Sequence, residues 1–161
     1  MSPVSYEHAD LNLWLGSLLS VYVAEKRLGV IVGPEFTSRL RGGKSRRVPD
    51  LLFVAESRRE LIRPMHLDGP PDLVIEIVAT DSQSRDYREK FLEYESAGVR
   101  EYWIVDPFSK HVEAYTRGEN GEFTAIAEVE AKIASTVLPG FYLRNEWLWS
   151  NPRPTIRSLL A

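Results

Sequence analysis

Cysteine is absent from all 161 residues of the chain. Its absence excludes disulfides, thiolate zinc sites and cysteine nucleophiles. No apolar run approaches the roughly 20 residues that a transmembrane helix needs, and the first seven residues lack the basic and then apolar pattern of a secretory signal. No Gly-x-Ser-x-Gly motif supports a serine hydrolase. These absences predict a cytoplasmic protein whose chemistry uses neither thiols nor an activated serine.

Histidine and net charge are also low. The three histidines, His8, His66 and His111, are dispersed and do not show the HxxxH spacing of a zinc site. We therefore expect them to be surface or packing residues. The formal net charge is −3, which disfavours a protein that binds nucleic acid through overall electrostatic attraction.

Positive charge is nevertheless concentrated in residues 39–63. The basic residues there are Arg39, Arg41, Lys44, Arg46, Arg47, Arg58, Arg59 and Arg63, against three acids. The local charge is +5, so the rest of the chain carries −8. Such a basic strip could hold phosphate groups, because phosphate neutralisation supplies most sequence-independent affinity for nucleic acid. A solvated hairpin and loop would have the same composition.

The apolar pattern predicts helices and strands within one compact domain spanning residues 1–161, since 43% hydrophobic residues suffice for a sizeable core. Helices are expected at 6–27 and 84–97, the second closed by Gly98. Strands are expected at 30–32, 35–40, 48–54, 71–78, 101–105, 111–116 and 123–127. The first two strands should form a hairpin around Gly33 and Pro34, followed by a flexible turn at Gly42 and Gly43, and the last two strands should form another hairpin.

Two of these strands carry carboxylates among apolar residues: Asp50 on one, and Asp72 and Glu76 on the other. A carboxylate on a buried strand is costly unless it is paired, hydrogen-bonded or bound to a cation, so the acids suggest a metal site. The backbones of Asp72 and Glu76 are roughly 13 Å apart, too far to chelate one ion side by side. If the strands are antiparallel with residue 50 opposite residue 76, the Cβ atoms of Asp50 and Glu76 are about 5 Å apart and could hold one divalent cation. We therefore pair Asp50 with Glu76, although the long connection at 55–70 permits other registers.

Lys90 supplies a cation shortly after this pair. On the predicted helix it shares a row with Tyr87 and Tyr94, at a spacing of three and four residues. The helix follows the strand of Glu76 and would pack back on the sheet, which can direct the ammonium group at the acids. Alternatively, Lys90 forms a surface pair with Asp86 at the i,i+4 spacing, worth only about 0.3 to 0.5 kcal/mol.

The same residues belong to a longer pattern. It comprises Val48-Pro-Asp50, Pro71-Asp-Leu-Val-Ile-Glu-Ile-Val78, then Asp86, Lys90 and Tyr94, then Ala97-Gly-Val-Arg-Glu-Tyr-Trp-Ile-Val-Asp-Pro107, and Leu138-Pro-Gly-Phe141. This pattern resembles the Uma-two family, which is classed with restriction endonucleases in the PD-(D/E)xK nuclease superfamily. The resemblance covers most of the chain from Glu7 onward. It implies a restriction-endonuclease-like α/β (α+β) fold with a mixed central sheet flanked by helices.

The resemblance also implies roles for individual residues. Asp50, Glu76 and Lys90 would be catalytic, and Mg²⁺ or Mn²⁺ would bind to Asp50, Glu76 and the carbonyl of Ile77. Glu7 and Asp72 would be additional acids, and Arg46, Arg47, Arg58 and Arg59 would contact the nucleic-acid backbone. Val78 stands where the superfamily signature has its lysine, so the resemblance implies that Lys90 on the next helix takes over this role.

Together these expectations predict a magnesium-dependent endonuclease that hydrolyses phosphodiester bonds of DNA. A second hypothesis is a catalytically inactive nuclease-fold module that binds nucleic acid or a protein partner, which Val78 and the acidic net charge favour. A third is a metal-dependent hydrolase of small phosphate esters. Trp147 and Trp149, which we expect to be exposed near the C-terminus, could form a homodimer contact.

Overall fold

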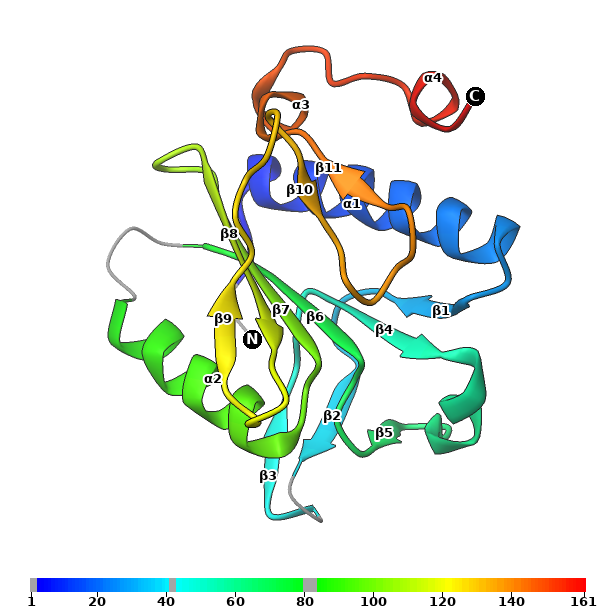
Figure 1. Ribbon diagram of the computed structural model, residues 1–161, viewed down its shortest axis with the longest axis vertical. Helices are drawn as coiled ribbons and strands as arrows, with labels where there is room; N and C mark the ends of the chain where they lie inside the picture. The colour runs from blue at the N-terminus through cyan, green and yellow to red at the C-terminus, as the bar shows by residue number, and fades with distance from the viewer. Residues whose placement is uncertain (1–2, 41–42, 80–83) are drawn as a thin grey trace.

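The largest element of the protein is a six-stranded mixed sheet in the order β1-β4-β6-β7-β8-β9 (Figure 1). The computed structural model describes residues 3–40, 43–79 and 84–161. The strands are β1 (Gly29–Val32), β4 (Leu51–Ala55), β6 (Leu73–Ile77), β7 (Glu101–Asp106), β8 (His111–Arg117) and β9 (Phe123–Ala125). Strands β6 and β7 are parallel, and the other neighbouring pairs are antiparallel.

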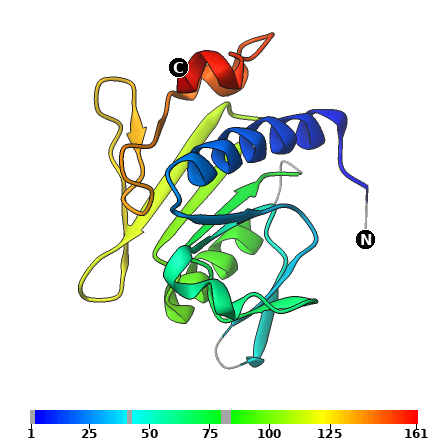
Figure 2. The same cartoon turned by 90° about the vertical axis from the view of Figure 1, so that its right-hand side faces the viewer.

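Helices cover both faces of this sheet, as Figures 1 and 2 show. On one face lies α1 (Tyr6–Glu25), with the short helices α3 (Asn145–Trp149) and α4 (Ile156–Leu160) beside it. On the other face lies α2 (Ser84–Ala97). A mixed sheet flanked by helices confirms the predicted fold class. Within the described part of the chain, no helix has the length and apolarity needed to cross a membrane.

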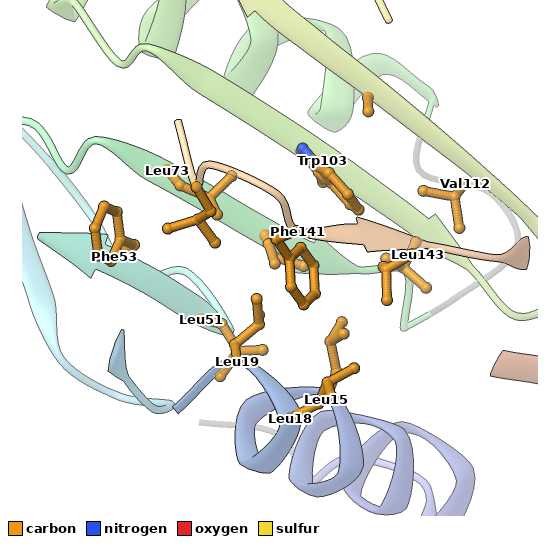
Figure 3. Packing of buried hydrophobic residues seen from close by; sticks show 14 of the residues in the cluster. Leu15, Leu18, Leu19, Leu51, Phe53, Leu73, Trp103, Val112, Phe141 and Leu143 are labelled. Atoms are coloured by element: carbon orange, nitrogen blue, oxygen red, sulfur yellow. The ribbon is translucent and has the colours of Figure 1, made fainter. Parts of the chain in front are cut away.

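The main core lies between α1 and the sheet (Figure 3). Helix α1 begins after Ser5, whose side chain accepts a hydrogen bond from the backbone N–H of His8 at 3.1 Å. Its buried apolar side chains are the predicted row Leu11, Leu15, Leu18, Leu19, Tyr22 and Val23. They pack against sheet residues that include Leu51, Phe53, Leu73 and Trp103. The three- and four-residue spacing therefore predicted both the helix and its buried side.

A smaller sheet, in the order β3-β2-β5, lies next to the main one. It consists of β2 (Thr37–Leu40), β3 (Ser45–Arg47) and β5 (His66–Asp68), and the 3₁₀ helix η2 (Glu56–Leu61) connects β4 to β5. Strand β2 is antiparallel to β3 and parallel to β5. Strands β10 (Ile133–Ala134) and β11 (Tyr142–Leu143) form a separate antiparallel pair.

The predicted hairpin between the first two strands is wrong, because β1 pairs antiparallel with β4. Strand β4 offers β1 a continuous apolar partner, whereas β2 alternates half-buried and buried residues and pairs with β3 and β5. The β1–β4 pairing brings the chains so close that a Cβ on Gly29 would lie 2.1 Å from the carbonyl oxygen of Val54. Gly42 of the predicted turn at Gly42 and Gly43 lies outside the described residues. Arg41 of the basic strip lies outside them too.

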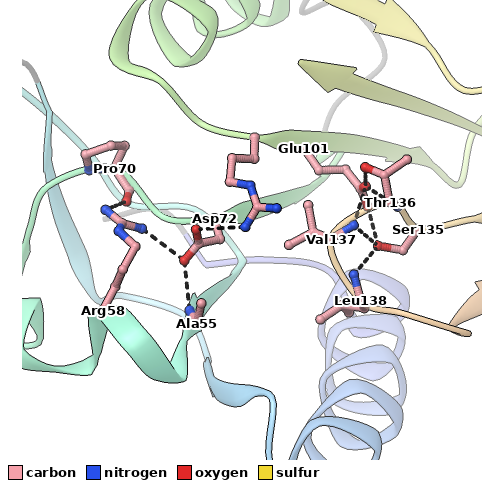
Figure 4. A network of polar contacts seen from close by, with 10 residues as sticks. Ala55, Arg58, Pro70, Asp72, Glu101, Ser135, Thr136, Val137 and Leu138 are labelled. Atoms are coloured by element: carbon pink, nitrogen blue, oxygen red, sulfur yellow. Dashed lines mark hydrogen bonds and ion pairs between the residues drawn. The ribbon is translucent and has the colours of Figure 1, made fainter. Parts of the chain in front are cut away.

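The C-terminal segment is tied to β7 by a buried carboxylate (Figure 4). Glu101 is fully buried and accepts hydrogen bonds from the side chain of Ser135 at 2.8 Å and from the backbone N–H of Thr136 at 2.7 Å. The indole N–H of Trp103 donates to the same carboxylate at 2.7 Å. The carboxylate therefore anchors the segment that leads to β11 and α3.

The expected exposure of Trp147 and Trp149 is wrong. Both side chains are half-buried and pack against the main core, because α3 folds its apolar residues back on it. The indole N–H of Trp149 is hydrogen-bonded to the side chain of Asn145 within the same helix. This removes the basis for a homodimer contact at these two residues.

Candidate active site

Strands β4 and β6 are paired in the predicted register. Leu51 is paired with Ile75 and Leu52 with Val74, so the residue that precedes β4, Asp50, falls opposite Glu76. The backbone N–H of Ile77 donates a hydrogen bond to Asp50 Oδ2 at 2.7 Å. The Asp50 carboxylate is therefore held at the end of β6, beside Glu76.

Lys90 reaches this pair from α2. Glu76 shares its face of β6 with Val74, which packs in the same cluster as Tyr94 of α2. Lys90 Nζ lies 3.4 Å from Glu76 Oε2, and the hydroxyl of Tyr94 donates to the same oxygen at 3.0 Å. Lys90 Nζ also lies 3.3 Å from Asp86 Oδ2. Both sequence-based alternatives for Lys90 are therefore present at once: it contacts the acid and it pairs along its helix.

Glu76 is only 4% exposed, and this burial dominates its electrostatics. Burial raises the pKa of the Glu76 carboxyl to about 7, because a charged carboxylate is poorly solvated there. Lys90 acts in the opposite direction and the charge of Asp50 in the same direction, and the pKa of about 7 is the net result. Additional positive charge at this position would thus stabilise the carboxylate form.

His8 is a site residue that the sequence prediction missed. It is buried on α1, and its Nε2 lies 3.4 Å from Asp50 Oδ1. The hydrogen bond with Asp50 raises the pKa of the His8 imidazole, and burial opposes this shift. We expected His8 to be a surface or packing residue. One feature of the sequence pointed to its buried position: His8 lies three residues before Leu11 and seven before Leu15, on the side of α1 that faces the sheet.

Glu7 and Asp72, the two additional acids, are not brought to this pair. Glu7 is exposed on α1, because neighbouring positions on a helix point in different directions and His8 is the one that faces the sheet. Asp72 lies before β6, at the opposite end from Glu76, and is 2% exposed. It accepts hydrogen bonds from the backbone N–H of Ala55 at 2.8 Å and from Arg58 at 2.9 Å (Figure 4). Asp72 is therefore an internal anchor.

The predicted basic strip is divided between the two ends of β4. Arg58 and Arg59 lie on η2, which follows the end of β4 about 17 Å from Asp50. Arg58 is bound to Asp72 and to the carbonyl of Pro70, so its predicted phosphate contact is replaced by an internal one. Arg59 is exposed and pairs with Glu56 at 2.8 Å. This end of β4 is thus separated from the acid pair.

The other end of the strip lies on the small sheet, close in sequence to Asp50. Arg47 donates from Nε and Nη2 to Glu93 Oε2 of α2, at 2.9 and 2.7 Å, so it connects β3 to α2. Arg46 is exposed and stands opposite Arg39 in the β2–β3 register. Two like charges directly opposite each other are unfavourable unless an anion lies between them. Asp68 of β5 is the other register partner of Arg39 and offsets part of this repulsion, so the exposed Arg46 is the residue of the pair best suited to a phosphate group.

The acid pair suits a hard divalent cation. Its donors are the carboxylates of Asp50 and Glu76 with the nearby carbonyl of Ile77, and an all-oxygen set is the type that Mg²⁺ and Mn²⁺ prefer. Among residues 3–40, 43–79 and 84–161, no group of three or more His, Asp or Glu side chains is arranged as a metal cluster. Burial raises the pKa of Glu76 and the charge of Asp50 adds to this shift, so a bound cation would stabilise the charged carboxylate. The residues present therefore fit a cation bound mainly by two acids.

The Uma2 (Uma-two) family, described as "Putative restriction endonuclease", matches residues 1–146. The chain belongs to this family. Membership of Uma2 supports a nuclease-like function for the protein, and with it a nucleic-acid substrate.

A solved structure supports the fold of this Uma2 protein. The chain is similar to "a putative nuclease belonging to DUF820 from Anabaena variabilis ATCC 29413", with a TM-score of 0.74 and 19% sequence identity. The similarity covers 92% of this chain and 83% of that chain. At this identity the likeness shows the fold alone. No curated protein matches the chain.

Proposed function

We propose that this Uma2 protein is a metal-dependent endonuclease that uses Mg²⁺ or Mn²⁺ to hydrolyse phosphodiester bonds of DNA. The observation that carries the proposal is the opposed pair of Asp50 and Glu76 with the ammonium group of Lys90 3.4 Å from Glu76. Two carboxylates can hold a divalent cation that activates water, and a lysine can stabilise the negative charge that develops on the phosphoryl group. Membership of the Uma2 family supports the same reaction class.

Each residue has a role that follows from its contacts. Asp50, Glu76 and the Ile77 carbonyl would hold the cation, which supplies Lewis acidity and a bound water of lowered pKa. Lys90 would donate hydrogen bonds to the attacking water or to the negative charge that develops on the phosphoryl group. His8 and the N–H of Ile77 orient the two oxygens of Asp50.

The nucleic-acid strand would be held outside this pair. Arg39 and Arg46 on the small sheet would bind backbone phosphates, because they are register partners at the end of the strip that is close in sequence to Asp50. Arg59, exposed at the far end of β4, would add a weaker contact. Arg47 and Arg58 are engaged by Glu93 and Asp72, so we assign them to positioning. Such contacts provide affinity without sequence readout.

A plasmid-nicking assay with Mg²⁺, Mn²⁺ or EDTA tests the proposal. We expect cleavage only with a divalent ion, and loss of at least about a hundredfold in rate for Glu76→Gln and Lys90→Met, because each removes a group that acts on the reacting phosphate. Glu113→Gln on β8 and Lys132→Met, which change the same residue types elsewhere, should cleave like wild type. Equal nicking by all five proteins would refute the assignment.

The inactive nuclease-fold module is the second candidate. The burial of Glu76 under Lys90 and Tyr94 favours it, because these contacts already compensate much of the carboxylate charge without a metal. Calorimetric titration with Mn²⁺ separates the two candidates. Mn²⁺ binding that Glu76→Gln weakens, without nicking of DNA or RNA, would favour the module. Hydrolysis of a small phosphate ester without nicking would point to the third hypothesis instead.

A further inference from the structure

Asp50 and His8 also line a pocket that the proposed chemistry does not use. It has a volume of about 950 Å³ and lies between α1 and the segments 31–35 and 48–51. We call it the α1 pocket, and its walls include Asn12, Leu13, Ile31, Glu35 and Val48. Its volume is in the range of sites that take up small organic molecules, roughly 300 to 1,000 Å³. Because it shares Asp50 with the acid pair, a group bound in it would lie next to a phosphate held at that pair.

The chemistry of the walls limits what can bind. Leu13, Ile31 and Val48 give apolar surfaces, and Leu13 and Val48 are 71% and 49% exposed. The acids on the wall are Glu35 and Asp50, and none of its described residues is lysine or arginine. A backbone phosphate would therefore be repelled. The pocket suits an uncharged group that has apolar faces and a polar edge.

Asn12 supplies a polar partner for such an edge. It lies on the buried side of α1 among the residues of the pocket, and its Oδ1 has no hydrogen-bond partner among the described residues. A side-chain amide offers both a donor and an acceptor, the combination that base edges match. Ser17, one turn further along α1, adds a hydroxyl to the same wall.

We propose that the α1 pocket receives the unstacked base of a nucleotide next to the phosphate that is cleaved, so that the protein acts on single-stranded or locally unpaired nucleic acid. The proposal rests on the proposed function, since it needs a nucleic-acid substrate at Asp50. A base is neutral, flat and apolar on its faces, with hydrogen-bonding groups along its edge. In an intact duplex the bases are stacked and paired, and turning one out costs a few kcal/mol. Single strands avoid this cost.

Binding measurements on labelled oligonucleotides test the pocket. With EDTA present, so that the probe is not cleaved, fluorescence anisotropy compares a single strand, the matching duplex and a duplex with a bulge. We expect the wild-type chain to bind the single strand and the bulge roughly tenfold more tightly than the intact duplex. Leu13→Ser and Val48→Ser should lose most of this preference, because they remove the apolar walls. Met65→Ser, which changes an apolar residue that is 81% exposed outside the pocket, should keep it.

An abasic probe makes the test specific for a base. A single abasic position moved along the strand should weaken binding by wild type at one or two positions, and Leu13→Ser should be insensitive to it. Equal affinity for single strand and duplex, or no sensitive position, would overturn the proposal. Cleavage with Mg²⁺ is measured in a separate assay. Nicking without any strand preference would contradict only the pocket proposal. A base-dependent binding preference without nicking would contradict only the catalytic proposal.

Discussion

Glu76 and Asp72 are two acids on the same stretch of chain with different surroundings. Both are almost completely buried. Asp72 is contacted by Arg58, by Arg100 and by a backbone N–H, so its charge is compensated from within the protein. Glu76 is contacted by Lys90 and Tyr94 and lies beside Asp50, and burial still raises its pKa to about 7. At the scale of single residues, Asp72 is thus balanced by two arginines, whereas Glu76 has one lysine and an acidic neighbour.

A pH dependence of stability follows from Glu76. Its pKa in the folded state is about 7, above the ordinary value of 4.5, so between these values the folded protein keeps a proton that the unfolded chain has lost. Stability should therefore fall as the pH rises from about 5 to 8, by up to about 3 kcal/mol. His8 acts in the same direction, because its raised pKa means that its stabilisation is lost as the pH rises through the folded-state value.

Urea unfolding in EDTA at several pH values measures this dependence. Glu76→Gln should flatten the profile, and Glu113→Gln on the exposed surface of β8 should leave it unchanged. If Glu76→Gln had the profile of wild type, the raised pKa of Glu76 would be refuted.

Helix α2 is the element that brings the lysine to the acids. Its position over the sheet is fixed on one side by the packing of Tyr94 against Tyr102, and on the other by the two hydrogen bonds from Arg47 of β3 to Glu93. Glu93 lies three residues after Lys90, so it is on the adjacent turn of the helix. The small sheet therefore influences the placement of Lys90 without contacting it.

Substitutions in the Arg47–Glu93 pair test this coupling. Arg47→Met and Glu93→Gln should lower kcat for Mg²⁺-dependent nicking by a similar factor, roughly tenfold, with KM little changed, because small displacements of a catalytic group are costly. The double variant should be no slower than either single variant, since each substitution removes the same Arg47–Glu93 interaction. A raised KM for Arg47→Met alone would instead indicate a phosphate contact by Arg47.

The sequence predicted those elements whose signals are local. The spacing on α1, the run of polar and apolar residues on α2 and the alternation on β8 each lie within one element. The register of Asp50 and Glu76 was an assumption, since the connection at 55–70 permits other registers, and the observed pairing of β4 with β6 matches it. The pairing of β1 with β4 was missed, because the prediction took Gly33 and Pro34 as a hairpin turn to the next strand, whereas β2 pairs with β3 and β5 in the small sheet. His8 was missed because its partner lies on another element.

The whole molecule carries a net charge of −3, and its basic strip is divided between the two ends of β4. Arg47 and Arg58 have internal partners, which leaves Arg39, Arg46 and Arg59 as the arginines that we assign to phosphate groups. Binding should therefore be weak and only moderately dependent on salt, unlike that of a strongly basic protein.

Salt titrations of single-strand binding test this distribution. Each phosphate contact contributes about −0.7 to the slope of log K against log salt for single strands, so we expect a slope of about −2. The double variant Arg39→Gln, Arg46→Gln should reduce its magnitude by about 1.4. Arg58→Gln should leave the slope unchanged and lower the stability to urea. An unchanged slope in the double variant would show that the phosphates lie elsewhere.

The way the site is distributed along the chain has a consequence for its assembly during folding. Tyr94 and Glu76 are 18 residues apart on one continuous strand-and-helix unit, whereas the Ile77–Asp50 bond spans 27 residues and joins a different strand. Contacts between segments that are further apart in the chain have a larger entropic cost of loop closure and form more slowly. The unit with Glu76 and Lys90 should thus form early, with Asp50 and His8 joining it later. Tight binding of a divalent ion would then report that the last step of folding is complete.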